Sequence, residues 1–369
     1  MASKILKDIA QFLTPAPPAF DTEYDGLEYT WKFLVFRPAL FKYEVFFLAI
    51  VLSYLAFYWI GSKMNHNKAK TWLDAHMGIL EKQFSRPTAG SSGDLTADGY
   101  TDFFAFSTGR RVVSSLHTVF TLRPRHDFFQ FAYQLAWGLV DLLYTPRDDV
   151  TLDFKLHANV AVPEFVWAVV TKEEANSIKK DRWDLTFTKT TENPRLPPSL
   201  VIMSEFADVT ENVLKIAGPV LEALRDHKIL PHFRSLSITD QPRVRPSVIS
   251  ADRGEKHVIL SLTAPPSSRA ADSAQLVSAV FGLIDSLEKV TLRTETKSKL
   301  KKAREIFAKT LKDEAERDAR EEAADAKLAA KRRAEEERIA RLSAAEQQKL
   351  LERDRKRNLR KTQGKIVKK

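Results

Sequence analysis

One uncharged stretch dominates the pattern of hydrophobic and polar positions along this chain. Residues 45–60 read VFFLAIVLSYLAFYWI and contain no charged side chain. With its flanks the stretch covers residues 41–61, or roughly 30 Å of helix, which matches the hydrocarbon thickness of a bilayer. Tyr43 stands at one end and Tyr58 and Trp59 at the other, where aromatic belts of membrane proteins lie. We therefore predict a transmembrane helix over residues 41–61; the alternative is a buried helix of a soluble domain.

The orientation of this helix is predicted from what lies on either side of it. Three lysine or arginine residues stand within about 20 residues of each end, so the positive-inside rule gives no preference. The N-terminal flank is short and shows no secretory signal pattern. The C-terminal part is large and lacks both cysteines and N-glycosylation sequons. We therefore predict a lumenal segment over residues 1–40 and a cytosolic segment over residues 62–369.

Small side chains recur along one face of the predicted span. Ala49, Ser53 and Ala56 are spaced i, i+4 and i+7 in a helix otherwise crowded with large residues. Faces of this kind let a second transmembrane helix approach closely. The spacing predicts that Ala49, Ser53 and Ala56 pack on a membrane partner, and chance spacing is the alternative.

The segment between residues 102 and 292 alternates between strand-like and helix-like patterns. It follows residues 62–101, which begin as a juxtamembrane helix and end in a linker rich in Gly, Ser, Pro and Asp. Val150–Leu156 alternates most clearly between apolar and polar side chains, as a half-buried strand does. The pattern predicts one cytosolic globular domain of α+β or α/β class over residues 102–292. Strands are expected over 102–106, 112–122, 150–156, 164–170, 200–203, 233–239 and 257–263, and helices over 127–144, 209–227 and 270–290.

Residues 293–369 have a different composition, dominated by Ala, Glu, Lys and Arg. Two helices are expected, over 297–342 and 344–361, because Ser343 and Glu346 have the spacing of a capping box. Large apolar side chains are too sparse along these helices to form a stable dimeric coiled coil. An antiparallel helical hairpin, or a coiled-coil helix that needs a partner, is therefore predicted for this tail.

The basic charge of the protein is concentrated in this tail. The whole chain has a net charge of +10, whereas residues 293–369 contain 26 basic and 15 acidic side chains, a net of +11. The last 21 residues alone contain ten basic and two acidic side chains. Clustered Lys and Arg side chains neutralise phosphates, so we predict that the tail binds ribosomal RNA. A solvated tail and binding to anionic lipid are the alternatives. The residues assigned to RNA are Arg353, Arg355, Lys356, Arg357, Arg360, Lys361 and Lys365.

Catalytic, cofactor and metal-binding patterns are not found in the sequence. The chain has no cysteine, which excludes disulfides, thiolate metal sites and a cysteine nucleophile. The twelve glycines form no phosphate-binding or dinucleotide-binding loop, and the eight histidines are isolated. Asp148–Asp149 reads as a turn before a strand, a structural feature and not a catalytic one. Acidic residues before the span lack the spacing of a calcium-binding loop. We therefore expect a protein that is not an enzyme and holds no cofactor.

Several local segments resemble one known family. Gly109-Arg-Arg followed by LRPRHDFFQ at 122–130 resembles its strand-to-helix segment, and LPPSLVIMSE at 196–205 with DVT at 208–210 is similar to its central stretch. KRRAEEERI at 331–339 and the closing KIVK resemble its tail. By these segments the chain resembles, roughly over residues 40–369, the calumin family, also called coiled-coil domain-containing protein 47.

The resemblance implies a function. The family provides a subunit of the PAT complex, an intramembrane chaperone of the endoplasmic reticulum (ER). It implies a single-pass ER membrane factor, not an enzyme, that assists the biogenesis and folding of multispan membrane proteins. The implied partners are a small multispan subunit of the Asterix type, the ribosome, the Sec translocon and nascent membrane proteins. Animal members also have a long acidic lumenal segment implicated in calcium binding, for which this sequence has no counterpart. The alternative is a membrane-anchored coiled-coil scaffold or tether that binds proteins or anionic lipid, with a link to ER calcium homeostasis.

Overall fold

The computed structural model describes residues 26–31, 34–88, 95–141, 144–246 and 254–340. They fall into two compact units, each assembled from separate stretches of the chain. Unit 1 comprises residues 1–155, 222–235 and 259–281, and unit 2 comprises residues 156–221, 236–258 and 282–369. We describe each unit by itself.

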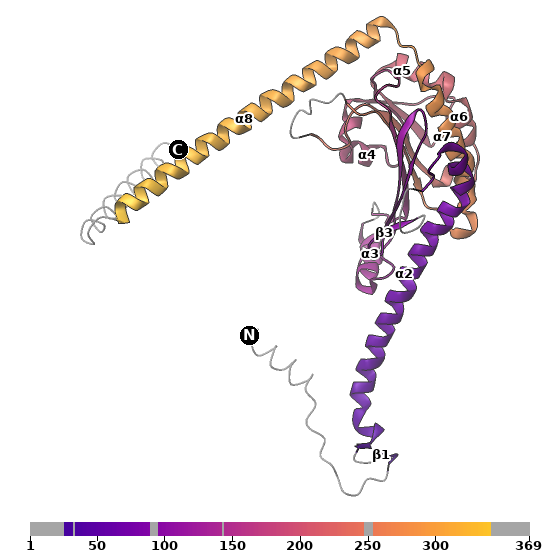
Figure 1. Ribbon diagram of the computed structural model, residues 1–369, viewed down its shortest axis with the longest axis vertical. Helices are drawn as coiled ribbons and strands as arrows, with labels where there is room; N and C mark the ends of the chain where they lie inside the picture. The colour runs from indigo at the N-terminus through magenta and orange to yellow at the C-terminus, as the bar shows by residue number, and fades with distance from the viewer. Residues whose placement is uncertain (1–25, 32–33, 89–94, 142–143, 247–253, 341–369) are drawn as a thin grey trace. The chain divides into compact units, whose positions relative to one another are not determined.

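Unit 1 begins with a long apolar helix. After the antiparallel strands β1 (Tyr29–Trp31) and β2 (Leu34–Phe36) and the 3-10 turn η1 (Pro38–Phe41), the helix α2 runs unbroken over Lys42–Gln83 (Figure 1). Among the described residues α2 is the one helix that is long and apolar enough to cross a membrane. Its first part, residues 42–61, is exposed along almost its whole length, and we call it the candidate span. The second part has one buried face, so α2 continues from an exposed apolar stretch directly into the core of unit 1.

The core of unit 1 lies between a sheet and the second part of α2. The sheet contains, in spatial order, β3, β4, β5, β6 and most of β11. β3, β4 and β5 form an antiparallel meander in which Phe104 lies opposite Val119. Trp72 of α2 packs edge-on against Phe120, and Phe154 against Phe281. The strands are β3 (Thr96–Asp98), β4 (Asp102–Thr108), β5 (Val113–Thr121), β6 (Asp149–Leu156) and β11 (His257–Thr263). The other helices of unit 1 are α3 (Phe128–Val140), η3 (Leu230–His232), η4 (Ser267–Ser273) and most of α7 (Ala274–Ser286).

Unit 2 contains a second run of strands and the long C-terminal helix. β7 and β9 are antiparallel, with Val169 opposite Ile202, and their inward side chains form a cluster with Leu185. The strands, in spatial order, are most of β10 (Phe233–Thr239), then β7 (Trp167–Thr171), β9 (Leu200–Ser204) and β8 (Lys189–Thr191). The helices are α4 (Ala175–Asp181), η2 (Trp183–Phe187), α5 (Ala207–Ile216), most of α6 (Gly218–Ala223), η5 (Leu287–Lys289) and α8 (Thr294–Ala340).

The mixed helical and antiparallel architecture confirms the α+β reading of the fold class. Strands β10 and β11 have the predicted bounds. The helix predicted over 209–227 is instead two helices, because Pro219 cannot donate the backbone hydrogen bond that would join α5 to α6. The first tail helix is present as α8. The second tail helix, 344–361, lies outside the described residues, so the helical hairpin stays a prediction, as do the domain boundaries.

Candidate functional site

The candidate span presents its small side chains to the outside. Ala49, Ser53 and Ala56 are all exposed on α2. The face that they form is therefore accessible, as a helix-packing surface requires, and its partner remains a prediction. The residues assigned to RNA binding, from Arg353 to Lys365, lie outside the described residues.

Where α2 leaves the candidate span, another part of the chain passes very close to it. A Cβ atom at Gly61 would lie 1.9 Å from the backbone carbonyl oxygen of Arg125, so only glycine fits here. One turn further on, the Asn65 side-chain amide donates hydrogen bonds of 2.9 Å to the carbonyl oxygens of Tyr100 and Arg123. These contacts fix the segment that leads into α3 against α2.

Asp148 completes this arrangement, which we call the membrane-proximal cluster (Asn65, Lys68, Arg125 and Asp148). Its carboxylate is almost fully buried and accepts two hydrogen bonds from the Arg125 guanidinium at 2.8 and 2.7 Å and one from Lys68 Nζ at 2.6 Å. The backbone N–H of Arg123 donates another, at 2.9 Å. Burial acts to raise the pKa of Asp148, but these donors outweigh it and hold the pKa well below its usual range. The carboxylate is thus held as an anion by the surrounding donors, and its neighbour Asp149 is the first residue of β6 and not part of a turn.

A buried histidine lies further along α2. His76 Nδ1 lies 2.8 Å from the Trp72 carbonyl oxygen, which can only accept, so Nδ1 carries the proton. His76 Nε2 then accepts from the Ser273 hydroxyl at 3.1 Å, and that hydroxyl accepts from Trp72 Nε1 at 3.1 Å. Burial lowers the pKa of His76 to about 4, although its hydrogen bonds act to raise it. The histidine is therefore neutral and structural near pH 7.

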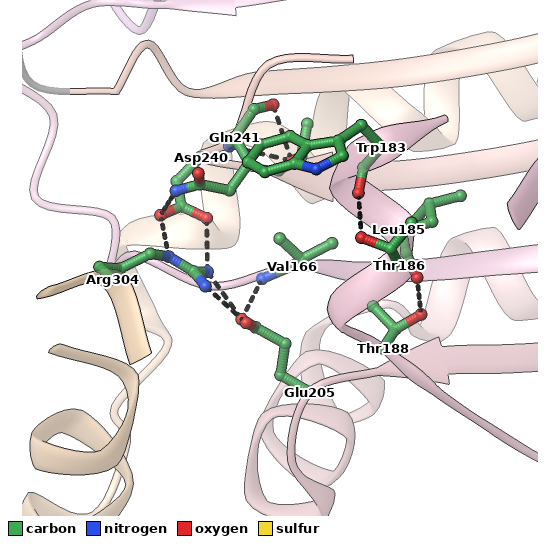
Figure 2. Close-up of polar contacts among 10 residues, drawn as sticks. Val166, Trp183, Leu185, Thr186, Thr188, Glu205, Asp240, Gln241 and Arg304 are labelled. Atoms are coloured by element: carbon green, nitrogen blue, oxygen red, sulfur yellow. Dashed lines mark hydrogen bonds and ion pairs between the residues drawn. The ribbon is translucent and has the colours of Figure 1, made fainter. Parts of the chain in front are cut away.

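Unit 2 contains a second buried charge cluster, at the beginning of α8 (Figure 2). The Arg304 guanidinium donates to both carboxylate oxygens of Glu205, at 2.6 and 2.8 Å, and to both of Asp240, at 2.9 Å each. Glu205 also accepts the backbone N–H of Val166 at 2.9 Å. Burial acts to lower the pKa of Arg304, and the two carboxylates raise it further than burial lowers it. We call Arg304, Glu205 and Asp240 the α8-root cluster.

Apolar contacts extend the attachment of α8 on the same face. The Phe307 ring lies 4.6 Å from that of Trp183 and 5.4 Å from that of Phe187, measured between centroids. Leu300 and Leu311 are buried. From residue 315 to the end of the described helix, every side chain that the structure describes is exposed. The helix is thus fixed to unit 2 by its first five turns or so, and the rest is free of it.

Sequence reasoning missed Arg304. It lies in a block of lysines and arginines that reads as a solvated face, and charge counting treats all of them alike. A signal was available, because Leu300, Arg304, Phe307 and Leu311 are spaced i, i+4, i+7 and i+11 along one helix face. A charge inside an apolar stripe has to be paired when the stripe is buried. The partners Glu205 and Asp240 are far away in sequence and could not be identified.

The described residues offer no metal centre: none of their histidine and carboxylate side chains form a group of three or more that could hold an ion. Both buried charge clusters are satisfied internally and use their charges to position helices. The geometry therefore indicates surfaces for packing and attachment, namely the candidate span and α8.

Comparison with known proteins gives these surfaces a context. Residues 40–361, from the start of the candidate span into the tail, match the family described as PAT complex subunit CCDC47. A UPF0674 endoplasmic reticulum membrane protein of Schizosaccharomyces pombe is 25% identical over 88% of this chain and 87% of its own length. A UPF0674 endoplasmic reticulum membrane protein of Saccharomyces cerevisiae is 21% identical over 66% of each chain.

The mouse PAT complex subunit CCDC47 is 24% identical over 46% of this chain and 36% of its own length. The homologues are thus ER membrane proteins, and the match confirms the resemblance seen in the sequence segments. Since the family match covers most of the chain, from the candidate span to the tail, the protein belongs to the PAT complex subunit CCDC47 family.

Proposed function

We propose that this protein is a PAT complex subunit, not an enzyme, that assists the biogenesis of multispan membrane proteins at the ribosome-bound translocon of the ER. The observation that carries the proposal is the continuous family match over residues 40–361, which includes both the candidate span and α8. In this proposal the N-terminus is lumenal and residues 62–369 are cytosolic. The span binds a small multispan subunit of the Asterix type through Ala49, Ser53 and Ala56.

The attachment of α8 supports a role for the tail at a distance from unit 2. Two carboxylates and two aromatic rings hold the helix at Arg304 and Phe307. Residues 315–340 then continue α8 for about 39 Å, and every side chain described there is exposed. A helix rooted in this way can present the basic segment beyond it to the ribosome, or to the Sec translocon beside it, while unit 2 keeps its own fold.

The proposal is tested by partner recovery from ER membranes. We expect the tagged chain, purified in mild detergent, to recover a small multispan membrane subunit and ribosomes. The double variant Ala49→Phe/Ser53→Phe should lose the membrane subunit but keep the ribosomes, because large side chains prevent close helix approach. Val51→Phe/Leu55→Phe, which changes two exposed side chains with the same i, i+4 spacing on the opposite side of the helix, is the matched control. Recovery that is equal for all three proteins would contradict the proposed face.

Function itself is tested in cells that lack the protein. A newly made multispan reporter with polar residues in its transmembrane helices should mature poorly, and a single-span reporter should mature normally. Re-expression of the chain should restore the multispan reporter. If both reporters mature equally well without the protein, the chaperone role is wrong, and a scaffold or tether is the better description.

A further inference from the structure

Helix α3 in unit 1 has an unusual surface. Its sequence, FFQFAYQLAWGLV, contains no charge, and none of its thirteen residues is buried. Phe129, Leu139 and Val140 are 72%, 82% and 77% exposed. Surfaces this apolar seldom face water in a soluble domain. The large hydrophobic side chains exposed on α3 are Phe128, Phe129, Tyr133, Leu135, Trp137, Leu139 and Val140.

The exposed apolar surface extends around most of α3. Only Phe131, Gln134 and Gly138, which share one face, are partly covered. A protein partner would cover one side of a helix, whereas a helix that is apolar nearly all round suits a surrounding apolar solvent. The shape of the exposed surface therefore favours lipid.

The first turn of α3 lies beside the candidate span. The ring of Phe128 meets that of Phe57 edge-on, with centroids 5.5 Å apart, and the ring of Phe129 lies 6.0 Å from that of Tyr54. Tyr54 and Phe57 belong to the last two turns of the uncharged run. If the span is surrounded by lipid at that depth, α3 begins at the same depth.

The membrane-proximal cluster holds α3 in this place. Arg125, which is bonded to Asp148 and Asn65, stands three residues before Phe128. Asp127 then caps the helix and accepts the backbone N–H groups of Phe129 and Gln130 at 2.9 and 3.1 Å. The charged side chains Asp127 and Asp141 thus stand at the two ends of α3 and none lies within it. With thirteen residues α3 is about 20 Å long, too short to cross a bilayer of roughly 30 Å.

We propose that α3 is a second membrane-embedded element, inserted into the leaflet that surrounds the C-terminal end of the candidate span, with its exposed side chains in contact with lipid acyl chains. The protein then touches the membrane through one spanning helix and one helix that enters a single leaflet. This proposal rests on the span being in the membrane. It is independent of the ribosome and of the chaperone role.

The absence of native cysteine makes the test direct, because any introduced cysteine is unique. Leu139→Cys and Leu135→Cys, each labelled with the environment-sensitive dye NBD, report on α3 in the full chain. Val51→Cys reports on the span, and Leu328→Cys, an exposed leucine of α8, is the matched aqueous control. The proteins are reconstituted into phosphatidylcholine vesicles at less than one chain per vesicle. Quenching is then measured with iodide in the buffer and with nitroxide-labelled lipid.

We expect the α3 probes to behave like the span probe. Their emission should be blue-shifted, iodide quenching should be lost relative to Leu328→Cys, and nitroxide lipid should quench them. Iodide quenching as strong as at position 328 would overturn the proposal. So would shielding from iodide without nitroxide quenching, because protein would then cover α3. An aqueous span probe would overturn it as well. Two α3 positions keep the test informative if one variant fails to fold.

Discussion

At the scale of single residues, Arg304 is the side chain on which the attachment of α8 depends most. Its guanidinium pairs with both Glu205 and Asp240, which are 5% exposed in their side chains. Without it two carboxylates are left close together with no countercharge. We expect Arg304→Met to lower the free energy of unfolding of the unit that contains it by about 3–5 kcal/mol. Arg304→Lys should also destabilise, because one ammonium cannot bond two carboxylates in parallel. Denaturant titration in detergent measures both.

The control for this prediction is another arginine of α8. Arg317 pairs with Glu321 at 3.7 Å on an exposed face of the same helix. Exposed pairs contribute at most about 1 kcal/mol, so Arg317→Met should change stability little. If Arg304→Met is no worse than Arg317→Met, the α8-root cluster does not hold the helix.

The buried histidine makes stability depend on pH. Burial lowers the pKa of His76 from its ordinary value of 6.5 to about 4 in the folded state. Below the unfolded pKa the unfolded chain binds a proton that the folded chain does not. Stability is therefore lost as pH falls from about 6.5 to about 4, with a slope of up to about 1.4 kcal/mol per pH unit. Between pH 7 and pH 5 the loss through His76 should be about 2 kcal/mol.

The variant His76→Gln should remove this pH dependence, because an amide cannot gain the proton. His227→Gln is the matched control, since the His227 side chain is 90% exposed. The test is to measure the free energies of unfolding of the wild type and of both variants at pH 7 and at pH 5. Parallel pH profiles for wild type and His76→Gln would show that His76 does not titrate as its burial implies.

At the scale of elements, α2 packs against the segment that leads into α3 at one glycine, Gly61. Gly61→Ala would place a methyl group 1.9 Å from the carbonyl oxygen of Arg125. The contact is between backbone segments, which cannot move apart without disturbing the packing on both sides. We expect the substitution to destabilise unit 1 and to displace the segment that carries α3. Gly78→Ala, in the same helix with nothing within 4 Å of its Cβ, should be neutral or stabilise by up to about 1 kcal/mol. Thermal unfolding and the NBD emission of Leu139→Cys report the two effects. Equal behaviour of both variants would contradict the close packing.

Elements were predictable from sequence where the pattern was local. The alternation in Val150–Leu156 gave β6 nearly its full bounds, because one face of that strand is buried and the other is half-exposed. The short strands β3 and β8 were missed, since three residues carry too little periodicity to stand out from a linker. The apolar pattern of α3 predicted a helix correctly but could not show its exposure. Which face of a helix is covered depends on segments far away in sequence, and so does the pairing of Arg304.

At the scale of the whole molecule, the charge distribution separates the tail from everything before it. Residues 293–369 have a net charge of +11, and the remaining 292 residues therefore have a net charge of −1. Within α8 the charges come in blocks that nearly cancel: residues 297–312 contain seven basic and one acidic side chain, and residues 313–325 contain two basic and seven acidic. Most of the excess, a net of +8, lies in the last 21 residues. An anionic partner such as ribosomal RNA should therefore be met by the end of the chain and not by the body of α8.

The last prediction tests this separation by charge reversal. Changing six tail cations to Glu should abolish ribosome co-sedimentation at physiological salt, because each Lys or Arg bound to a phosphate releases counterions. The same reversal at six exposed cations of α8 should leave sedimentation nearly unchanged and serves as the matched control. Both proteins should still insert into membranes, since the control set is exposed on α8 and both sets are far in sequence from the candidate span. The tail set is Arg353, Arg355, Lys356, Arg357, Arg360 and Lys361, and the control set is Lys302, Lys309, Lys312, Arg317, Arg320 and Lys327.

The outcomes separate the competing roles of the tail. Loss of ribosome binding only in the tail variant, with a steep salt dependence in the wild type, would support the ribosomal contact. If the wild-type chain instead binds anionic vesicles and no ribosomes, and the tail variant loses the vesicles, the tail is a lipid tether. If the tail variant still sediments with ribosomes, the contact lies elsewhere in the chain. The tail cations would then act mainly to keep a long exposed helix in solution, because like charges oppose its self-association.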